Sequence, residues 1–334
     1  MLVVTGADGH VGNVVVRALL AAGERPVAWT FGELARRSLA GLDVPRLTVD
    51  VRDAAAVHAA LAGARVVIHL AGHIAIDPAG DRLVEPVNLG GTRHVVAACL
   101  AHGARLFHMS TAHALDADHP GARPISETQP LLTPGADAMP YDLSKAEAER
   151  VVLAAVARGL DAVILSPSAV IGPDDYGPSH FAQRFGTLMT SPVAVAGGYN
   201  FVDVRDVASA VVAALTRARR GERYLLPGHQ VSARHLAELI TEVGGTRPPW
   251  LTVPLWAMRL GLPLVEALAR ATRRPPFYNR HILRILEAAS DFSHAKAQRE
   301  LGFSPRPLRQ SLADACAFYR AAGYLPPGPP MPRQ

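Results

Sequence analysis

The stretch that decides the fold is the opening of the chain, MLVVTGADGHVG, residues 1–12. An apolar run leads into three glycines spaced three apart, Gly6, Gly9 and Gly12, and the helical pattern VVVRALLAAG follows. A strand, a tight glycine turn and a helix N-terminus form, in this order, a dinucleotide-binding unit.

Each part of this turn has a physical task in the predicted unit. Gly6 lets the backbone turn sharply, Gly9 lets it approach a pyrophosphate, and Gly12 lets the helix pack closely on the strand. His10 and Val11 begin the predicted helix, whose free N–H groups and partial positive charge attract phosphate. An ordinary strand–turn–helix could carry the same glycines, so the prediction depends on partners further along the chain.

Length and composition indicate one large α/β domain, or one domain with a smaller lobe. The chain has 334 residues, of which 49% are hydrophobic and 19% charged, which is enough apolar material for a sizeable core. Cys99 and Cys316 are the only cysteines, too few for a disulfide framework or a cysteine metal cluster. Because the first strand begins at residue 2 and no uncharged apolar run reaches spanning length, we expect a cytoplasmic protein without a transmembrane segment.

The charge pattern does not indicate nucleic acid or a metal. The net charge is +5, but the arginines are scattered and no basic run is interleaved with aromatics. His69 and His73 lie across a strand end rather than on one helix face, and no HExxH motif is present. We therefore expect a small-molecule substrate, no nucleic-acid partner and no metal.

Strand-like apolar runs alternate with helical patterns over the first half of the chain. The expected strands after the first are 25–31, 45–50, 65–72, 104–111 and 161–167. The expected helices between them are 53–62, 82–102 and 142–158. This alternation predicts a Rossmann-type, doubly wound parallel sheet covered by helices on both faces. Ligands bind such sheets outside the carboxyl ends of the strands.

The residues after the second and third strands are candidates for binding the adenosine half of a coenzyme. Glu33 could accept hydrogen bonds from the ribose of NAD, and Arg36 could bind the extra phosphate of NADP. Both could instead be ordinary surface residues; we favour NADP(H) over NAD(H). After the third strand, Asp50 could accept from the adenine amino group and Val51 could line the ring, although Asp50 could also cap the next helix.

The ends of the fourth and fifth strands lead to the predicted chemistry. Leu70, Ala71 and Gly72 are small or apolar residues that let the backbone pass beside a coenzyme. Tyr141 and Lys145 share one face of the helix after the fifth strand.

A lysine ammonium and a nicotinamide charge would favour the phenolate and bring a tyrosine into the working range of an acid/base, and Thr111 could bind the same substrate oxygen. A chance surface pair is the alternative, but the chain has only two lysines, Lys145 and Lys296.

Together these motifs resemble the extended short-chain dehydrogenase/reductase family. The motifs are TGADGHVG (5–12), DVRD (50–53), NLGGT (88–92), Ser110-Thr111 and YDLSK (141–145). The resemblance implies that Tyr141 is the acid/base, that Lys145 holds the coenzyme ribose and tunes Tyr141, and that Thr111 orients the substrate.

The same resemblance implies further roles. Asn88 resembles the family's structural asparagine and belongs with the coenzyme site. The segment SPSAVIG (166–172), which includes Pro167 and Ser168, resembles the part that passes the nicotinamide. A homodimer through the helices at 82–102 and 142–158 is expected from the family.

Two later segments suggest the branch of the family. RPPFYNRH (274–281) and FSHAKAQRELGFSP (292–305) resemble 3β-hydroxysteroid dehydrogenases, dihydroflavonol-reductase-like proteins and hopanoid-associated epimerase-like proteins. Nucleotide-sugar enzymes of the family usually carry an arginine and a later asparagine where this chain has Ser166 and Ala169. This departure argues against a nucleotide-sugar substrate.

The predicted organisation places the coenzyme domain at 1–165, with 200–226 returning to it. A mostly helical substrate lobe comprises 166–199, expected as loop and short helix, and 227–325; a flexible tail follows at 326–334. The apolar segment 250–271 is expected to form a pocket wall or a buried helix, with contact at a membrane surface as the alternative.

The predicted function is NAD(P)-dependent interconversion of a ketone or aldehyde and an alcohol on a fairly apolar small molecule. The alternatives are a sugar epimerase or dehydratase that returns the hydride to its substrate, and a non-catalytic NAD(P) sensor.

Overall fold

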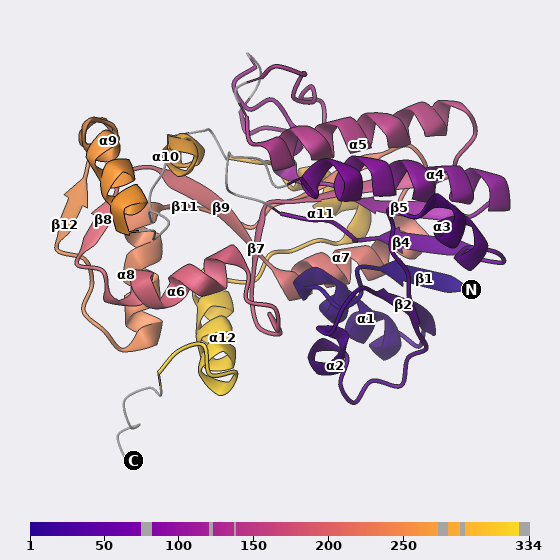
Figure 1. Cartoon of the computed structure of the whole chain (residues 1–334), viewed down its shortest axis with the longest axis horizontal. Helices are drawn as coiled ribbons and strands as arrows, with labels where there is room; N and C mark the ends of the chain where they lie inside the picture. The colour runs from indigo at the N-terminus through magenta and orange to yellow at the C-terminus, as the bar shows by residue number, and fades with distance from the viewer. Residues whose placement is uncertain (75–81, 120–122, 137, 273–279, 288–290, 327–334) are drawn as a thin grey trace.

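The computed structural model describes residues 1–74, 82–119, 123–136, 138–272, 280–287 and 291–326 (Figure 1). The predicted tail after residue 326 and most of the 274–281 motif lie outside these residues. Within the described residues, no helix combines the length and the apolar character that crossing a bilayer requires.

The centre of the molecule is a seven-stranded parallel sheet in the order β10-β6-β5-β4-β1-β2-β3. Its strands are β1 (Leu2–Thr5), β2 (Pro26–Thr30), β3 (Arg46–Thr48), β4 (Val66–His69), β5 (Arg105–Met109), β6 (Ala162–Pro167) and β10 (Arg223–Leu226). The order reverses between β1 and β4, where doubly wound sheets bind ligands. The prediction of a Rossmann-type parallel sheet is confirmed.

Helices cover both faces of this sheet, and each face has its own apolar core (Figure 1). One face carries α3 (Ala54–Ala60), α4 (Gly91–His102) and α5 (Pro140–Ala157); a π-helical turn, η1 (Glu85–Gly90), runs into α4. The other face carries α1 (His10–Ala21), the short α2 (Ala35–Ser38), α7 (Val204–Arg217) and α11 (Ala295–Leu301). The expected helices at 53–62, 82–102 and 142–158 correspond to α3, η1 with α4, and α5.

The rest of the chain builds a second lobe around smaller sheets. It contains β7 (Ala169–Ile171), α6 (His180–Thr190), β8 (Val193–Val195), β9 (Gly198–Asp203), β11 (His229–Ser232), α8 (Ala233–Gly244), β12 (Leu251–Val253), α9 (Leu255–Thr272), α10 (Arg280–Glu287) and α12 (Leu308–Ala321). β9 pairs with β7 and β11, and β8 pairs with β12. Most of its core residues come from α6, α8 and α12.

The expectation of only loop and short helix over 166–199 is wrong. β7 and β8 lie there, each three residues long. Both pair with strands far along the chain, β9 and β12. A three-residue strand has too little periodicity to be seen locally, and its stability comes from the distant partner.

Candidate active site

The glycine turn after β1 is built by close backbone approaches. Gly6 has a φ of +63°, and a Cβ there would lie 2.7 Å from the backbone of Ala71 after β4. A Cβ on Gly12 would overlap the backbone of Gly6 and Ala7. Gly9 is different, because a Cβ there would meet only the Gly6 carbonyl oxygen, at 3.4 Å. Gly6 and Gly12 therefore close the turn, and Gly9 leaves space beside it.

Residues at the start of α1 fasten the turn to the second lobe. His10 Nε2 lies 2.9 Å from the carbonyl oxygen of Pro173. Asn13 Nδ2 donates to the carbonyl oxygens of Gly9 and Asp174. Val11 packs against the core on the α1 face. The loop after β7 therefore holds one side of the glycine turn.

A directed chain of hydrogen bonds crosses the sheet at the switch point. Thr5 Oγ1 accepts from the N–H groups of Leu70 and Ala71, so its own hydrogen goes to His69 Nδ1 at 2.8 Å. His69 Nε2 then donates to Thr92 Oγ1 at 3.2 Å, because the Thr92 hydroxyl itself donates to the Asn88 carbonyl. Burial and the Lys145 charge lower the pKa of His69 to about 3, so it stays neutral in this chain.

Asn88 lies in the π-helical turn and holds two neighbouring segments together. Its Oδ1 accepts from His73 N at 2.7 Å, and its Nδ2 donates to the carbonyl of His73 and to Ser144 Oγ. Ser144 in turn donates to the carbonyl of Tyr141 at 2.7 Å. Both amide hydrogens of Asn88 are thus used within the protein, where they position the segment after β4 and the first turn of α5.

Tyr141 and Lys145 lie one turn apart at the start of α5. Lys145 is 5% exposed, and its Nζ donates to the carbonyl of Met109 at the end of β5, at 2.8 Å. A Cβ on Gly72 would lie 3.5 Å from this Nζ, so the small residue leaves room beside the ammonium group. The Tyr141 hydroxyl has no hydrogen-bond partner among the described residues.

Burial changes the titration of both groups. It lowers the pKa of Lys145 to about 8, while the Glu149 carboxylate acts in the opposite direction. Burial and the neighbouring Asp142 raise the pKa of Tyr141 above its ordinary value. Burial therefore favours the neutral phenol of Tyr141, whereas the lower pKa predicted from the sequence requires a nicotinamide charge as well as Lys145.

Thr111 follows β5, and its hydroxyl forms hydrogen bonds within the protein. Its hydroxyl donates to the carbonyl of Pro167 at 3.5 Å and accepts from His113 N at 3.3 Å. Ser168, after Pro167, is 4% exposed, and its hydroxyl has no partner within the described chain. Both threonine bonds are long, so this hydroxyl is weakly held at the strand edge beside Pro167 and Ser168.

Sequence reasoning missed the residues that surround Tyr141. The Asp142 carboxyl lies near Tyr141 and Tyr199, and burial raises its pKa to about 7. The Tyr199 ring stacks on His113 with centroids 4.8 Å apart, and Phe292 meets the His113 ring edge-on. Tyr199 comes from β9 of the second lobe, so only the tertiary structure brings it here.

The residues predicted for the adenosine half are less free than expected. Asp50 receives a bidentate bond from Arg52, and Arg36 pairs with Glu33 at 2.7 Å with both side chains exposed. The Val51 side chain lies against Gly91 of α4, and its carbonyl accepts from His94 Nδ1.

An acidic group not singled out in the sequence lies closer to the end of β2. Asp8, in the glycine turn, is 7% exposed, and its Oδ2 accepts from Phe31 N at 3.2 Å. Burial raises the pKa of Asp8, and the Phe31 N–H opposes this shift. The carboxylate therefore lies at the strand end where dinucleotide folds read the adenosine ribose.

These residues suit a nicotinamide dinucleotide. The turn at Gly9 is open, the α1 N-terminus follows it, and no Cβ at Gly72 obstructs the space beside Lys145. A pyrophosphate would lie on the glycine turn, and Lys145 has ammonium hydrogens for ribose hydroxyls beyond the one given to Met109.

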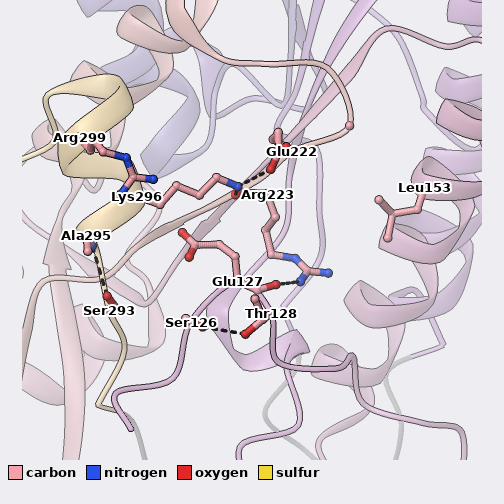
Figure 2. Close-up of a pocket in the computed structure, with 11 residues that line it drawn as sticks. Ser126, Glu127, Thr128, Leu153, Glu222, Arg223, Ser293, Ala295, Lys296 and Arg299 are labelled. Carbon is pink, nitrogen blue, oxygen red and sulfur yellow. Dashed lines mark hydrogen bonds and ion pairs between the residues drawn. The ribbon is translucent and has the colours of Figure 1, made fainter. Parts of the chain in front are cut away.

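A separate polar pocket of about 520 Å³ lies along the outer edge of β10 (Figure 2). It is lined by Ser126, Glu127, Thr128, Leu153, Gly221, Glu222, Arg223, Ser293, Ala295, Lys296 and Arg299. Lys296 bonds to Glu222 and to the carbonyl of Arg223, each at 2.6 Å, and Glu127 accepts from Leu225 N. These side chains form hydrogen bonds with backbone groups on the unpaired edge of β10. The second lysine of the chain, Lys296, therefore has a structural role.

The parallel sheet, the glycine turn and the Tyr–Lys helix together define an extended short-chain dehydrogenase/reductase. The profile of the NAD dependent epimerase/dehydratase family matches residues 2–226, and the chain belongs to that family. It is an oxidoreductase of this family.

Individual relatives extend this likeness over the second lobe. The chain is 32% identical to sterol demethylase protein B of Methylococcus capsulatus, over 96% of this chain and 99% of that protein. It is 28% identical to a putative dihydroflavonol 4-reductase of Synechocystis, over 96% and 95% of the two chains. The crystal structure of gox2253 superposes with a TM-score of 0.83 at 30% identity, covering 97% of this chain and 99% of that one.

Proposed function

We propose that the chain is a nicotinamide-dependent reductase that interconverts a ketone or aldehyde and an alcohol on a fairly apolar small molecule. The observation that carries this proposal is the pair on α5. The Tyr141 hydroxyl is unpartnered within the described residues, and one turn away the buried Lys145 is anchored to Met109. Two relatives are named for a sterol and for a dihydroflavonol, which supports an apolar substrate class.

When bound, the reduced coenzyme supplies a hydride to the carbonyl carbon. Tyr141 donates its hydroxyl proton to the carbonyl oxygen, and the positive charge of Lys145 stabilises the phenolate that this transfer leaves. The raised pKa of Tyr141 keeps the proton available for this direction. Thr111 donates a hydrogen bond to the same oxygen once its long bond to Pro167 is exchanged.

We propose that the coenzyme is NAD(H) rather than the NADP(H) favoured from the sequence. Arg36, on which that preference rests, is paired with Glu33 and exposed. Asp8 places a largely buried carboxylate at the end of β2. Such a group accepts from a ribose hydroxyl and repels an added phosphate.

The alternatives are distinguished by the fate of the coenzyme. An epimerase or dehydratase returns the hydride to its substrate, so the coenzyme is not consumed. A sensor binds the coenzyme and transfers no hydride. Ala169, which stands where nucleotide-sugar enzymes usually carry a polar residue, supports a different substrate class. The retained Tyr141 and Lys145 support catalysis over sensing.

The test is the absorbance of reduced nicotinamide in the presence of sterol, flavonoid and simple aryl ketones. Steady loss of the signal with one ketone is expected. Tight NADH binding without turnover of any ketone, together with conversion of a nucleotide sugar, would refute the proposal.

A further inference from the structure

Helix α9 of the second lobe exposes an apolar face that the proposed chemistry does not use. Trp256, Leu260 and Leu264 are 67%, 75% and 76% exposed, at a spacing of four residues that puts them on one helical face. Trp250, just before β12, is 75% exposed as well. Figure 1 shows α9 and β12 at the end of the second lobe furthest from β1.

The opposite face of α9 is also apolar and already has partners. Leu262 is buried with Val195 and Leu283, and Leu255 and Met258 pack against the same cluster. Packing therefore explains the inner face of α9 and leaves the outer face without a partner among the described residues. A helix that is apolar on both sides normally has both sides covered.

The charge of this segment indicates what covers the outer face. Residues 243–274 contain five arginines and one glutamate, so these 32 residues carry a formal charge of +4 out of +5 for the whole chain. Within 243–265 there is no acidic residue, and the two charged residues are Arg247 and Arg259. Arg247 is exposed, while Arg259 pairs with Glu287.

Exposed tryptophan and leucine in a segment of positive formal charge suit the interface of a negatively charged lipid bilayer. A second copy of the chain would bring the same positive charge to the same face, which disfavours a symmetric dimer there.

We propose that the outer face of α9, with Trp250, Trp256, Leu260 and Leu264, docks the enzyme on the surface of an anionic lipid bilayer. The helix lies on the bilayer and does not cross it. Docking would bring the second lobe to a pool of apolar substrate; this link, but not the docking itself, rests on the proposed function. Of the expectation for 250–271, a pocket wall or a buried helix, the inner face of α9 then fits the buried helix.

The test uses the purified full-length chain and sucrose-loaded vesicles, without coenzyme or substrate. We expect it to co-sediment with vesicles of phosphatidylcholine mixed with phosphatidylglycerol, more than with phosphatidylcholine alone, and less at high salt. The triple variant Trp256→Ser/Leu260→Ser/Leu264→Ser should bind about tenfold or more weakly. Leu47→Ser, at a 42% exposed leucine of the distant edge strand β3, is the matched control and should bind as wild type.

Two outcomes would overturn the proposal. One is equal vesicle binding by the wild type and a folded triple variant, with folding checked by NADH affinity. The other is a wild type that ignores anionic vesicles but sediments as a dimer that the triple variant dissociates, because α9 would then be a protein interface. Failure of docking is distinct from failure of the proposed function, since reduction of a water-soluble ketone does not need the vesicles.

Discussion

The charge of Asp8 should decide which coenzyme the chain prefers, and Asp8→Asn tests it. The carboxylate is 7% exposed and bonded to Phe31 N, so an asparagine oxygen can keep that bond while the charge is lost. Two unit charges about 4 Å apart repel by about 1 kcal/mol in water and about 4 kcal/mol at the effective dielectric near a protein surface. The low exposure of Asp8 favours the upper part of this range.

In affinity, this energy corresponds to between about 5-fold and about 1000-fold. We expect the wild type to bind NADH more tightly than NADPH, and Asp8→Asn to shift the ratio of dissociation constants toward NADPH by at least about tenfold. The assay is titration of protein fluorescence with each coenzyme. Glu24→Gln is the control: Glu24 is exposed and follows the C-terminal end of α1, at the other end of that helix from the glycine turn, so the ratio should stay nearly unchanged. Wild type that prefers NADPH, or an unchanged ratio in Asp8→Asn, would refute the reasoning.

Three further predictions follow from burial and geometry. Because Lys145 has a pKa lowered to about 8, ketone reduction should slow as pH rises through this value and the ammonium loses its proton; a rate that stays flat well above it would contradict this role. His108 is fully buried, neither ring nitrogen has a hydrogen-bond partner among the described residues, and its pKa is well below the ordinary value of 6.5. The unfolded chain therefore binds this proton first, so His108 costs about 1 kcal/mol of stability between pH 6.5 and about pH 5.5. In urea titrations at these two pH values, His108→Phe should reduce the loss of stability by that amount. Gly6→Ala places a Cβ 2.7 Å from Ala71, whereas Gly23→Ala, also at positive φ, meets nothing within 4 Å. Gly6→Ala should therefore be the less stable of the two by about 1–3 kcal/mol in thermal or urea unfolding, and equal losses would show that the close approach costs nothing.

The parallel sheet could be predicted because its evidence is local. Most strands of the first half are apolar runs before a helical pattern, and the glycine spacing after β1 is visible in the sequence, although the contact that requires Gly6 comes from Ala71 after β4. The Tyr141–Lys145 spacing is likewise a property of one helix. Such features remain visible without the fold.

Other parts of the site depend on contacts between distant segments. Tyr199 reaches the surroundings of Tyr141 from β9, and the Asp8 carboxylate meets β2 through the fold of the glycine turn. The pairing of Asp50 with Arg52 was missed for a different reason. Arg52 is only two residues away, but the pairing depends on the conformation of its side chain. The burial that raises the pKa of Tyr141 was also not visible in the sequence, because burial is a property of the packed chain.

The central claim is that the Tyr141 hydroxyl delivers the proton in a coenzyme-dependent reduction. The most direct measurement compares wild type with Tyr141→Phe. This substitution removes only the hydroxyl group, which has no hydrogen-bond partner among the described residues. We expect the variant to bind NADH as wild type does and to lose turnover of the ketone by about 100-fold or more. Turnover within a few-fold of wild type, in a variant that still binds NADH, would contradict the account.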